Sequence, residues 1–205
     1  MNKKEVIFVL LNEYADWESG FLAPALHGRI QDGPTKYCVK TLGLTKAPIQ
    51  SFGGFYTFPD YDINSLPEEY SALVLVGANH SWHTEEAKQI IPLIETTLSK
   101  NLVLAAICDA TVFLGVNGFL NANKHTSNTL EVLKTISETK YLGEKNYLEE
   151  QAVRDGKLIT ANGTGYLEFT KEVLLALEAY SPEQIETYYN TYKRGYYEMI
   201  KSIRD

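Results

Sequence analysis

Cys108 stands where a cysteine can serve as a nucleophile. It follows the continuous apolar run 102–107 (LVLAAI), which has the length of a buried strand, and it precedes a run that suits a helix. A side chain at such a strand-to-helix corner points into the crevice at the sheet edge. The small residues Ala106 and Ala110 leave room for the tight corner. Free N–H groups at the start of the helix lower the pKa of a thiol, so we expect Cys108 to be reactive.

Two other residues bear on this thiol. Glu18 lies in the first predicted helix, just past the end of the first strand, so its carboxyl can face the same crevice. A carboxyl that stays protonated there can donate a hydrogen bond to a thiolate. On position alone, the competing interpretation of Glu18 is a solvent-exposed glutamate. Asp109 follows the cysteine directly, and its charge partly offsets the helix dipole. Cys38 lies in the middle of a predicted strand, which favours an inert buried thiol.

A thiol nucleophile for acyl transfer usually needs a histidine base. His27 falls within a predicted helix, far from the strand ends, which favours a structural role. His80 and His83 lie in the loop after the strand at 72–76, at the edge where we expect Cys108. Their spacing permits metal binding, but no third ligand of clear type converges on them, so we expect no metal. We expect these two histidines to line the site.

The polar run 124–128 (KHTSN) is a predicted short strand. Its side chains alternate between two faces, with His125 on one face and Asn128 on the other. Only one of these faces can look at Cys108, and the pattern leaves open which one. His125 and Asn128 are therefore both candidates for lining the site.

The wider pattern is that of strands alternating with helices. This order predicts an α/β fold of the flavodoxin-like, doubly wound class, with a mostly parallel sheet sandwiched by helices. Gly-Gly at 53–54 and Asp-Gly at 155–156 predict two hairpins. The predicted strands are 5–11, 36–42, 72–76, 102–107 and 158–161, and the predicted helices are 16–30, 84–99, 108–117, 130–137 and 166–180.

The end of the chain has its own signature. Residues 181–184 (SPEQ) form a capping box with proline at the first helical position. A stripe of tyrosines and aliphatic residues then continues at helical spacing. We therefore expect an α/β domain at 1–180 and a C-terminal amphipathic helix at 181–205, docked on that domain or on the partner of a homodimer.

Composition excludes several classes of protein. The 205 residues include 19 Lys and Arg against 26 Asp and Glu, a net charge of −7, and no basic block suggests nucleic-acid binding. No apolar stretch approaches the length of a membrane span, and no signal segment is recognisable. Two distant cysteines without a disulfide framework favour a reducing, cytoplasmic location. The dinucleotide-binding fingerprint and the P-loop are absent, so we expect no cofactor.

Three features together resemble the ThiJ/PfpI superfamily, which has a class I glutamine-amidotransferase-like fold. They are the string AAICDA at 105–110, Glu18 in the first helix, and the run RDGKLITANGTGYLEF at 154–169. The resemblance covers about residues 4–180. It implies a nucleophilic Cys108 at a nucleophile elbow, Glu18 as its partner, and an oxyanion pocket formed by backbone N–H groups of the Gly77-Ala78 turn and of Asp109.

The chain departs from that pattern at three positions. Members with a protease-type triad carry His directly after the cysteine, whereas this chain has Asp109. The second glycine of the oxyanion turn is Ala78, whose backbone is more restricted. Where some members place a histidine near the thiol, this chain offers Asn128, with His125 three positions earlier. The resemblance therefore supplies the cysteine but no base.

The function expected from these observations is that of a cysteine-dependent, hydrolase-like enzyme. It would be protease-like, amidase-like or glyoxalase-like, and its substrate would be a small carbonyl or amide compound or a modified protein. The alternative is a stress-response protein without turnover, in which Cys108 senses oxidation by becoming a sulfinate held by Glu18.

Overall fold

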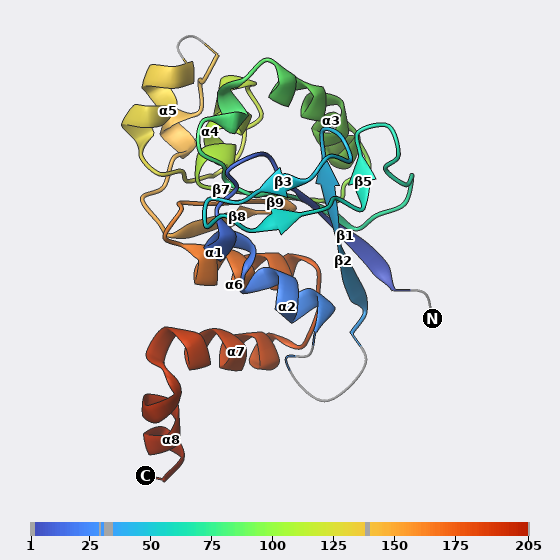
Figure 1. The fold of residues 1–205 in the computed structure, drawn as a ribbon. Coiled ribbons are helices and arrows are strands. Elements are labelled where there is room, and N and C mark those ends of the chain that lie inside the picture. Colours follow the sequence, from blue (N-terminus) through green and yellow to red (C-terminus); the bar gives the residue numbers. More distant parts are fainter. Residues whose placement is uncertain (1–2, 29, 31–34, 138–139, 205) are drawn as a thin grey trace.

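The computed structural model describes residues 3–28, 30, 35–137 and 140–204. Its centre is a seven-stranded sheet (Figure 1). Neighbouring strands run parallel except at one edge, where β8 and β9 form an antiparallel pair. In spatial order the strands are β5 (Tyr61–Asp62), β2 (Tyr37–Gly43), β1 (Lys4–Val9), β6 (Ala72–Leu75), β7 (Val103–Ile107), β9 (Leu158–Ala161) and β8 (Ala152–Asp155).

Helices cover both faces of this sheet (Figure 1). One face carries α1 (Asp16–Ser19), α2 (Leu22–His27) and α6 (Tyr166–Ala176), and the other carries α3 (Ile91–Ser99) and α4 (Asp109–Val116), with α5 (Leu130–Ser137) beside α4. Every residue of β6 and β7 is buried, which explains why these strands are continuous apolar runs. The expected α/β fold with a mostly parallel sheet is confirmed.

A small hairpin stands apart from the main sheet. Its strands β3 (Ile49–Gln50) and β4 (Tyr56–Thr57) pair antiparallel across the turn that contains the Gly-Gly sequence. Gly54 has a φ of 86°, a left-handed conformation that glycine adopts without strain. The turn chemistry therefore accounts for the hairpin that the sequence predicts here.

The predicted helix at 16–30 is two short helices. The α-helix is interrupted at Gly20 and Phe21, which form a turn between α1 and α2 although both keep right-handed φ and ψ. Pro24, which we expected to kink a longer helix, is the third residue of α2, where its missing N–H has no partner within the helix to lose. Two side chains of α1, Trp17 and Glu18, line the cavity that also holds Cys108.

Two further segments differ from expectation. The predicted helix at 84–99 is α-helical only in α3, and it is preceded by the 3-10 helices η1 (Ser81–His83) and η2 (Glu86–Ile90). The run 124–128 is not a strand, because it makes only an isolated bridge between His125 and Tyr147 and pairs with no named strand. A third 3-10 helix, η3, spans Glu144–Asn146.

The C-terminal segment is also broken in two. Gly195 has a φ of 86° and separates α7 (Pro182–Arg194) from α8 (Tyr196–Arg204). Ser181 caps α7 through the expected capping box. Helix α7 lies along α6 and buries Ile185, and the Tyr188 hydroxyl donates to the Phe21 carbonyl at 3.0 Å. Helix α8 lies farther from the sheet (Figure 1), with the rings of Tyr196 and Tyr197 exposed.

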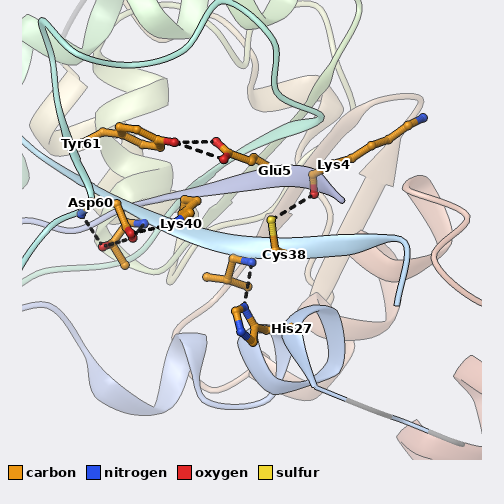
Figure 2. A network of polar contacts seen from close by, with 9 residues as sticks. Lys4, Glu5, His27, Cys38, Lys40, Asp60 and Tyr61 are labelled. Atoms are coloured by element: carbon orange, nitrogen blue, oxygen red, sulfur yellow. Dashed lines mark hydrogen bonds and ion pairs between the residues drawn. The ribbon is translucent and has the colours of Figure 1, made fainter. Parts of the chain in front are cut away.

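Cys38 and His27 lie together near β2, away from the carboxyl ends of the strands (Figure 2). The Cys38 sulfur is 3.8 Å from the Lys4 carbonyl, and burial raises the pKa of this half-buried thiol. His27 accepts a hydrogen bond at Nδ1 from the Val39 N–H at 3.3 Å, which ties α2 to β2. Both contacts join side chains to the backbone of the sheet, which fits the structural role expected for these two residues.

No helix within the described part of the chain is both long enough and apolar enough to cross a membrane.

Candidate active site

Cys108 occupies the corner between β7 and α4. Its φ of 58° and ψ of −128° form a combination that residues with a side chain rarely adopt. The backbone is held there because the Cys108 N–H donates to the Ala161 carbonyl at 2.9 Å and the Cys108 carbonyl accepts from the Thr111 N–H at 3.0 Å. Strained backbone of this kind persists only where the surroundings over-determine it, and it is concentrated at functional sites.

Glu18 is fully buried beside this corner. Its Oε2 accepts a hydrogen bond from the Gly77 N–H at 2.8 Å, while Oε1 is buried without a partner in hydrogen-bond geometry among the described residues. Burial raises the pKa of Glu18 to about 7, although interactions with the Cys108 thiol and the Gly77 amide lower it. Because Oε2 is engaged by a donor, the proton of the neutral carboxyl belongs on Oε1.

The Cys108 thiol does not have the depressed pKa that the helix start suggested. Burial, followed by the charge of Glu18, raises its pKa to about 12, which outweighs the lowering by Asn128 and by the Asp109 backbone. A low-dielectric surrounding penalises the thiolate more than the end of an eight-residue helix favours it. The charge of Glu18 contributes only while that carboxyl is ionised, so the two groups compete for one proton.

Asn128 joins the thiol to the loop after β9. Its Oδ1 accepts from the Gly163 N–H at 2.9 Å, and its Nδ2 points at the Cys108 sulfur from 3.3 Å. The Gly163 N–H can only donate, which settles which end of the amide is oxygen. The amide nitrogen is therefore available as a donor to a negatively charged sulfur.

Two glycines make room for the pair. A Cβ atom at Gly77 would come within 2.5 Å of Glu18 Oε2 and 2.8 Å of Cys108 Cβ. A Cβ at Gly163 would lie 2.8 Å from the Cys108 sulfur and 3.3 Å from Glu18 Oε1. Gly77 was among the expected site residues, whereas Gly163 was not. The only hint at Gly163 was the NGTG turn at the correct sheet edge, which resembles a phosphate-binding loop more than the wall of a thiol pocket.

The thiol opens onto a cavity of about 660 Å³ at the carboxyl ends of the strands. Most of the residues expected at the site line this cavity. It is lined by Glu13, Ala15, Trp17, Glu18, Phe52, Gly77, Ala78, Asn79, His80, His83, Cys108, Asp109, Asn128 and Ile136. A larger cavity of about 870 Å³ lies on the other side of Asn128, but neither cysteine nor histidine lines it. The smaller cavity is therefore the candidate active site, because it holds Cys108 and the histidines.

Asp109 and His83 form a pair within the cavity. Asp109 Oδ1 is 2.8 Å from His83 Nε2, and both side chains are only partly exposed. Asp109, which follows the cysteine directly, thus contacts a histidine that comes from η1. Carboxylate and imidazole in this contact fix the orientation of the ring. His80, at a φ of 56°, lines the same cavity.

Two backbone N–H groups near the thiol have no backbone acceptor within the described part of the chain. The Asp109 N–H is at the first turn of α4 and interacts with the Cys108 sulfur. The Ala78 N–H lies between the bonded amides of Gly77 and Asn79. Such amides can bind an oxyanion if they converge on one point.

His125 lies outside this cavity, contrary to the expectation that it lines the site. It is fully buried, with Nδ1 at 2.7 Å from the Asn123 carbonyl and Nε2 at 2.7 Å from the Tyr141 hydroxyl. The Asn123 carbonyl can only accept, so Nδ1 carries the proton and Nε2 accepts from Tyr141. Burial lowers the pKa of His125. The ring is a neutral core residue packed against Tyr141 and Tyr147.

Among the described residues, no group of three or more His, Cys, Asp and Glu side chains is arranged to hold a metal ion.

The chain is similar to known proteins over most of its length. The model of the DJ-1/PfpI family matches residues 4–176. A Bacillus subtilis protein named "uncharacterized protease YdeA" is 37% identical over 194 residues, which cover 95% of this chain and 93% of that protein. A second Bacillus subtilis protein, "uncharacterized protease YoaZ", is 30% identical over 209 residues and 99% of both chains.

A solved structure shows the same fold. The crystal structure of a ThiJ/PfpI family protein from Bacillus anthracis superposes with a TM-score of 0.87 at 34% identity, covering 94% of this chain and 92% of that one. The likeness extends over nearly the whole of both chains.

Proposed function

The chain belongs to the DJ-1/PfpI family, and from that premise we propose that it is a cysteine-dependent hydrolase acting on a carbonyl or amide substrate. The observation that carries the proposal is the strained backbone of Cys108, which directs a thiol into a cavity beside a carboxyl whose pKa is about 7. Strain at a nucleophile elbow has no benefit for packing, and a carboxyl with that pKa can take up and release a proton near neutral pH.

The first step uses the pair of Cys108 and Glu18. The thiol proton moves to ionised Glu18, and the sulfur forms a bond to the substrate carbonyl carbon. The π-electron pair of the C=O bond moves to the oxygen, where the N–H groups of Ala78 and Asp109 can stabilise it. Asn128 holds the thiolate in place through its Nδ2. An aldehyde substrate would undergo the same step, and its oxyanion would take the proton held by Glu18 to give a hemithioacetal.

An amide substrate then needs a proton on its leaving group. The C–N bond breaks as the amine takes the proton held by Glu18, which leaves a thioester on Cys108. Water attacks the thioester carbonyl and gives a proton to Glu18. The C–S bond breaks, the acid leaves, and the thiolate takes back that proton. His83, oriented by Asp109, is positioned to contact the leaving group and the attacking water.

Cysteine substitutions test this function. Cys108→Ser is expected to abolish turnover of methylglyoxal and of peptide amides, whereas Cys38→Ser is expected to leave it unchanged, because Cys38 contacts only the Lys4 carbonyl near β2. Both variants replace a cysteine with a serine, so they differ only in the position of the replaced thiol. Retained turnover in Cys108→Ser would show that the hydrolase proposal is wrong.

A second candidate function is an oxidation sensor, and one observation favours it. Protonated Glu18 and the Asn128 amide are two donors beside one sulfur, and they could hold the oxygens of a sulfinate. The thiolate would attack one peroxide oxygen, break the O–O bond and release hydroxide, and a second peroxide would add the second oxygen. Intact-mass measurement after peroxide treatment tests this candidate, which is excluded if Cys108 gains no oxygen.

A further inference from the structure

An aromatic pair forms the outer wall of the active-site cavity. The rings of Trp17 and Phe52 meet edge to face with centroids 6.1 Å apart, and both rings are about half exposed. They line the same cavity as Cys108, and Ile136 from α5 adds a third exposed apolar side chain to the wall. Large apolar groups that stay exposed beside a nucleophile form a surface for an apolar part of a ligand.

Polar contacts hold both rings in place without burying them. The Trp17 indole N–H donates to the Gly163 carbonyl at 3.1 Å, which ties the ring to the loop that also contacts the thiol. The Gly53 N–H donates to Asp16 Oδ2 at 2.7 Å, and the Phe52 N–H donates to the Tyr14 carbonyl at 2.8 Å. The wall is therefore organised before a ligand arrives, which reduces the entropy cost of binding.

The fit at Gly53 is tight. A Cβ there would lie 2.9 Å from Asp16 Oδ2, so a glycine lets the hairpin approach α1 closely enough for the hydrogen bond. The hairpin is thus fastened to α1 by the residue that follows Phe52.

The charges in the cavity select against anions. Among its described lining residues there is neither Lys nor Arg, whereas Glu13, Glu18 and Asp109 each carry a carboxyl. Asp109 is in contact with His83, and Glu18 is neutral for part of the time near pH 7. A carboxylate or phosphate on the ligand would meet like charges and no cationic partner.

We propose that the substrate is an uncharged or cationic carbonyl compound with an apolar or aromatic group next to the reacting carbonyl. This group lies against Trp17 and Phe52 while the carbonyl reaches Cys108. The proposal rests on the proposed function, because it assumes that Cys108 is the group that reacts with the ligand. It excludes keto acids and phosphorylated compounds as preferred substrates.

Alkylation of Cys108 tests this selectivity without requiring turnover. The reduced full-length chain is treated at pH 7 with iodoacetamide, iodoacetate and N-benzyl iodoacetamide, and the rate at Cys108 is followed by peptide mass spectrometry. Each rate is divided by the rate of the same reagent with N-acetylcysteine. We expect the benzyl reagent to exceed iodoacetamide, and iodoacetamide to exceed iodoacetate, by about tenfold at each step.

Variants assign the selectivity to the wall. Phe52→Ala is expected to lower the rate with the benzyl reagent more than the rate with iodoacetamide, so that most of the advantage of the benzyl reagent is lost. Phe55→Ala is the matched control, because Phe55 is an exposed phenylalanine in the same hairpin turn but does not line the cavity. Glu13→Gln is expected to raise the iodoacetate rate selectively.

Several results would overturn the proposal. Equal normalised rates, a faster reaction with iodoacetate, or a Cys108 inert to all three reagents would each contradict it. An equal loss with all reagents in Phe52→Ala would mean that the ring supports the fold and does not select ligands. Failure of the proposed function is distinguishable, because it would appear as turnover that survives Cys108→Ser even where the alkylation selectivity holds.

Discussion

Burial and, after it, the ionised carboxylate of Glu18 raise the pKa of the neighbouring Cys108 thiol, and the two groups titrate as a pair. Loss of the first proton from this pair gives either a carboxylate beside a thiol or a neutral carboxyl beside a thiolate. Only the second form is nucleophilic. The population of this nucleophilic form rises as the pair loses its first proton, near pH 7.

The reactivity of Cys108 is therefore expected to rise with pH through about 7 and then to level off. The measurement is the iodoacetamide alkylation rate at Cys108 between pH 5 and 9. In Glu18→Gln the step near pH 7 should disappear, because the glutamine cannot exchange a proton with the sulfur. A step that persists in that variant would assign the titration to another group.

Glu18 also predicts how stability depends on pH. Its folded pKa of about 7 lies above the ordinary value of 4.5, so the native state holds a proton that the unfolded state has lost. Its contribution to stability is complete below pH 4.5 and is lost as the pH rises to about 7, by about 3 kcal/mol. Urea unfolding of wild type and Glu18→Gln should show the variant gaining relative stability over this range. A constant difference would contradict the raised pKa.

Substitutions in the His83–Asp109 pair are expected to lower turnover without changing the reactivity of the Cys108 thiol. His83→Gln and Asp109→Asn are expected to lower kcat by about tenfold to a thousandfold while leaving Cys108 alkylation within about twofold. His80→Asn is the matched control, since His80 lines the same cavity at a left-handed position that asparagine tolerates. Equal losses in all three variants would mean that the pair has no special role.

Gly163→Ala is expected to damage the site through its methyl group. The added Cβ would lie 2.8 Å from the Cys108 sulfur, which must then shift. We expect a destabilisation of about 1–3 kcal/mol and slower alkylation of Cys108. Gly20→Ala provides the comparison, because its Cβ would meet nothing closer than 3.4 Å. Wild-type alkylation kinetics in Gly163→Ala would contradict the assigned packing.

Two truncations distinguish the contributions of α7 and α8 to the stability of the domain. Ending the chain after Arg194 is expected to leave the unfolding midpoint nearly unchanged, whereas ending it after Tyr180 removes buried Ile185 and the Tyr188 hydrogen bond and should destabilise the domain by about 2–5 kcal/mol. Sizing chromatography of the first truncation also tests whether α8 contributes to a homodimer. An unchanged elution volume would exclude that role.

Local patterns were sufficient to predict the central strands of the sheet and the place of the thiol, but not the two-residue edge strand β5. The apolar run before Cys108 could only be a buried strand, and a residue at its carboxyl end must lie at the crevice. Glu18 was within reach of the same edge from α1. The helix breaks at Gly20 and Gly195 were harder to predict, because glycine inside an amphipathic pattern is compatible with a continuous helix.

Side-chain partners could not be predicted from spacing. The 124–128 run alternates like a strand, but its backbone is irregular, and so Asn128 reaches the sulfur while His125 turns to Tyr141. The pairing of His83 with Asp109 depends on how η1 approaches α4, which no periodicity encodes. The shift of the Cys108 pKa depends on burial depth, which the sequence indicates only roughly.

The fastening of the hairpin to α1 has a consequence for how such a protein can diversify. The thiol and its partners are on the main sheet edge, whereas Phe52 belongs to a separate two-stranded unit. This unit is held by the hydrogen bond from Gly53 to Asp16 and by backbone bonds to Glu13 and Tyr14. Exchange of the loop at 51–58 can then alter what the cavity accepts while the reactive centre stays intact. The hairpin is the natural place to begin directed evolution toward a new substrate.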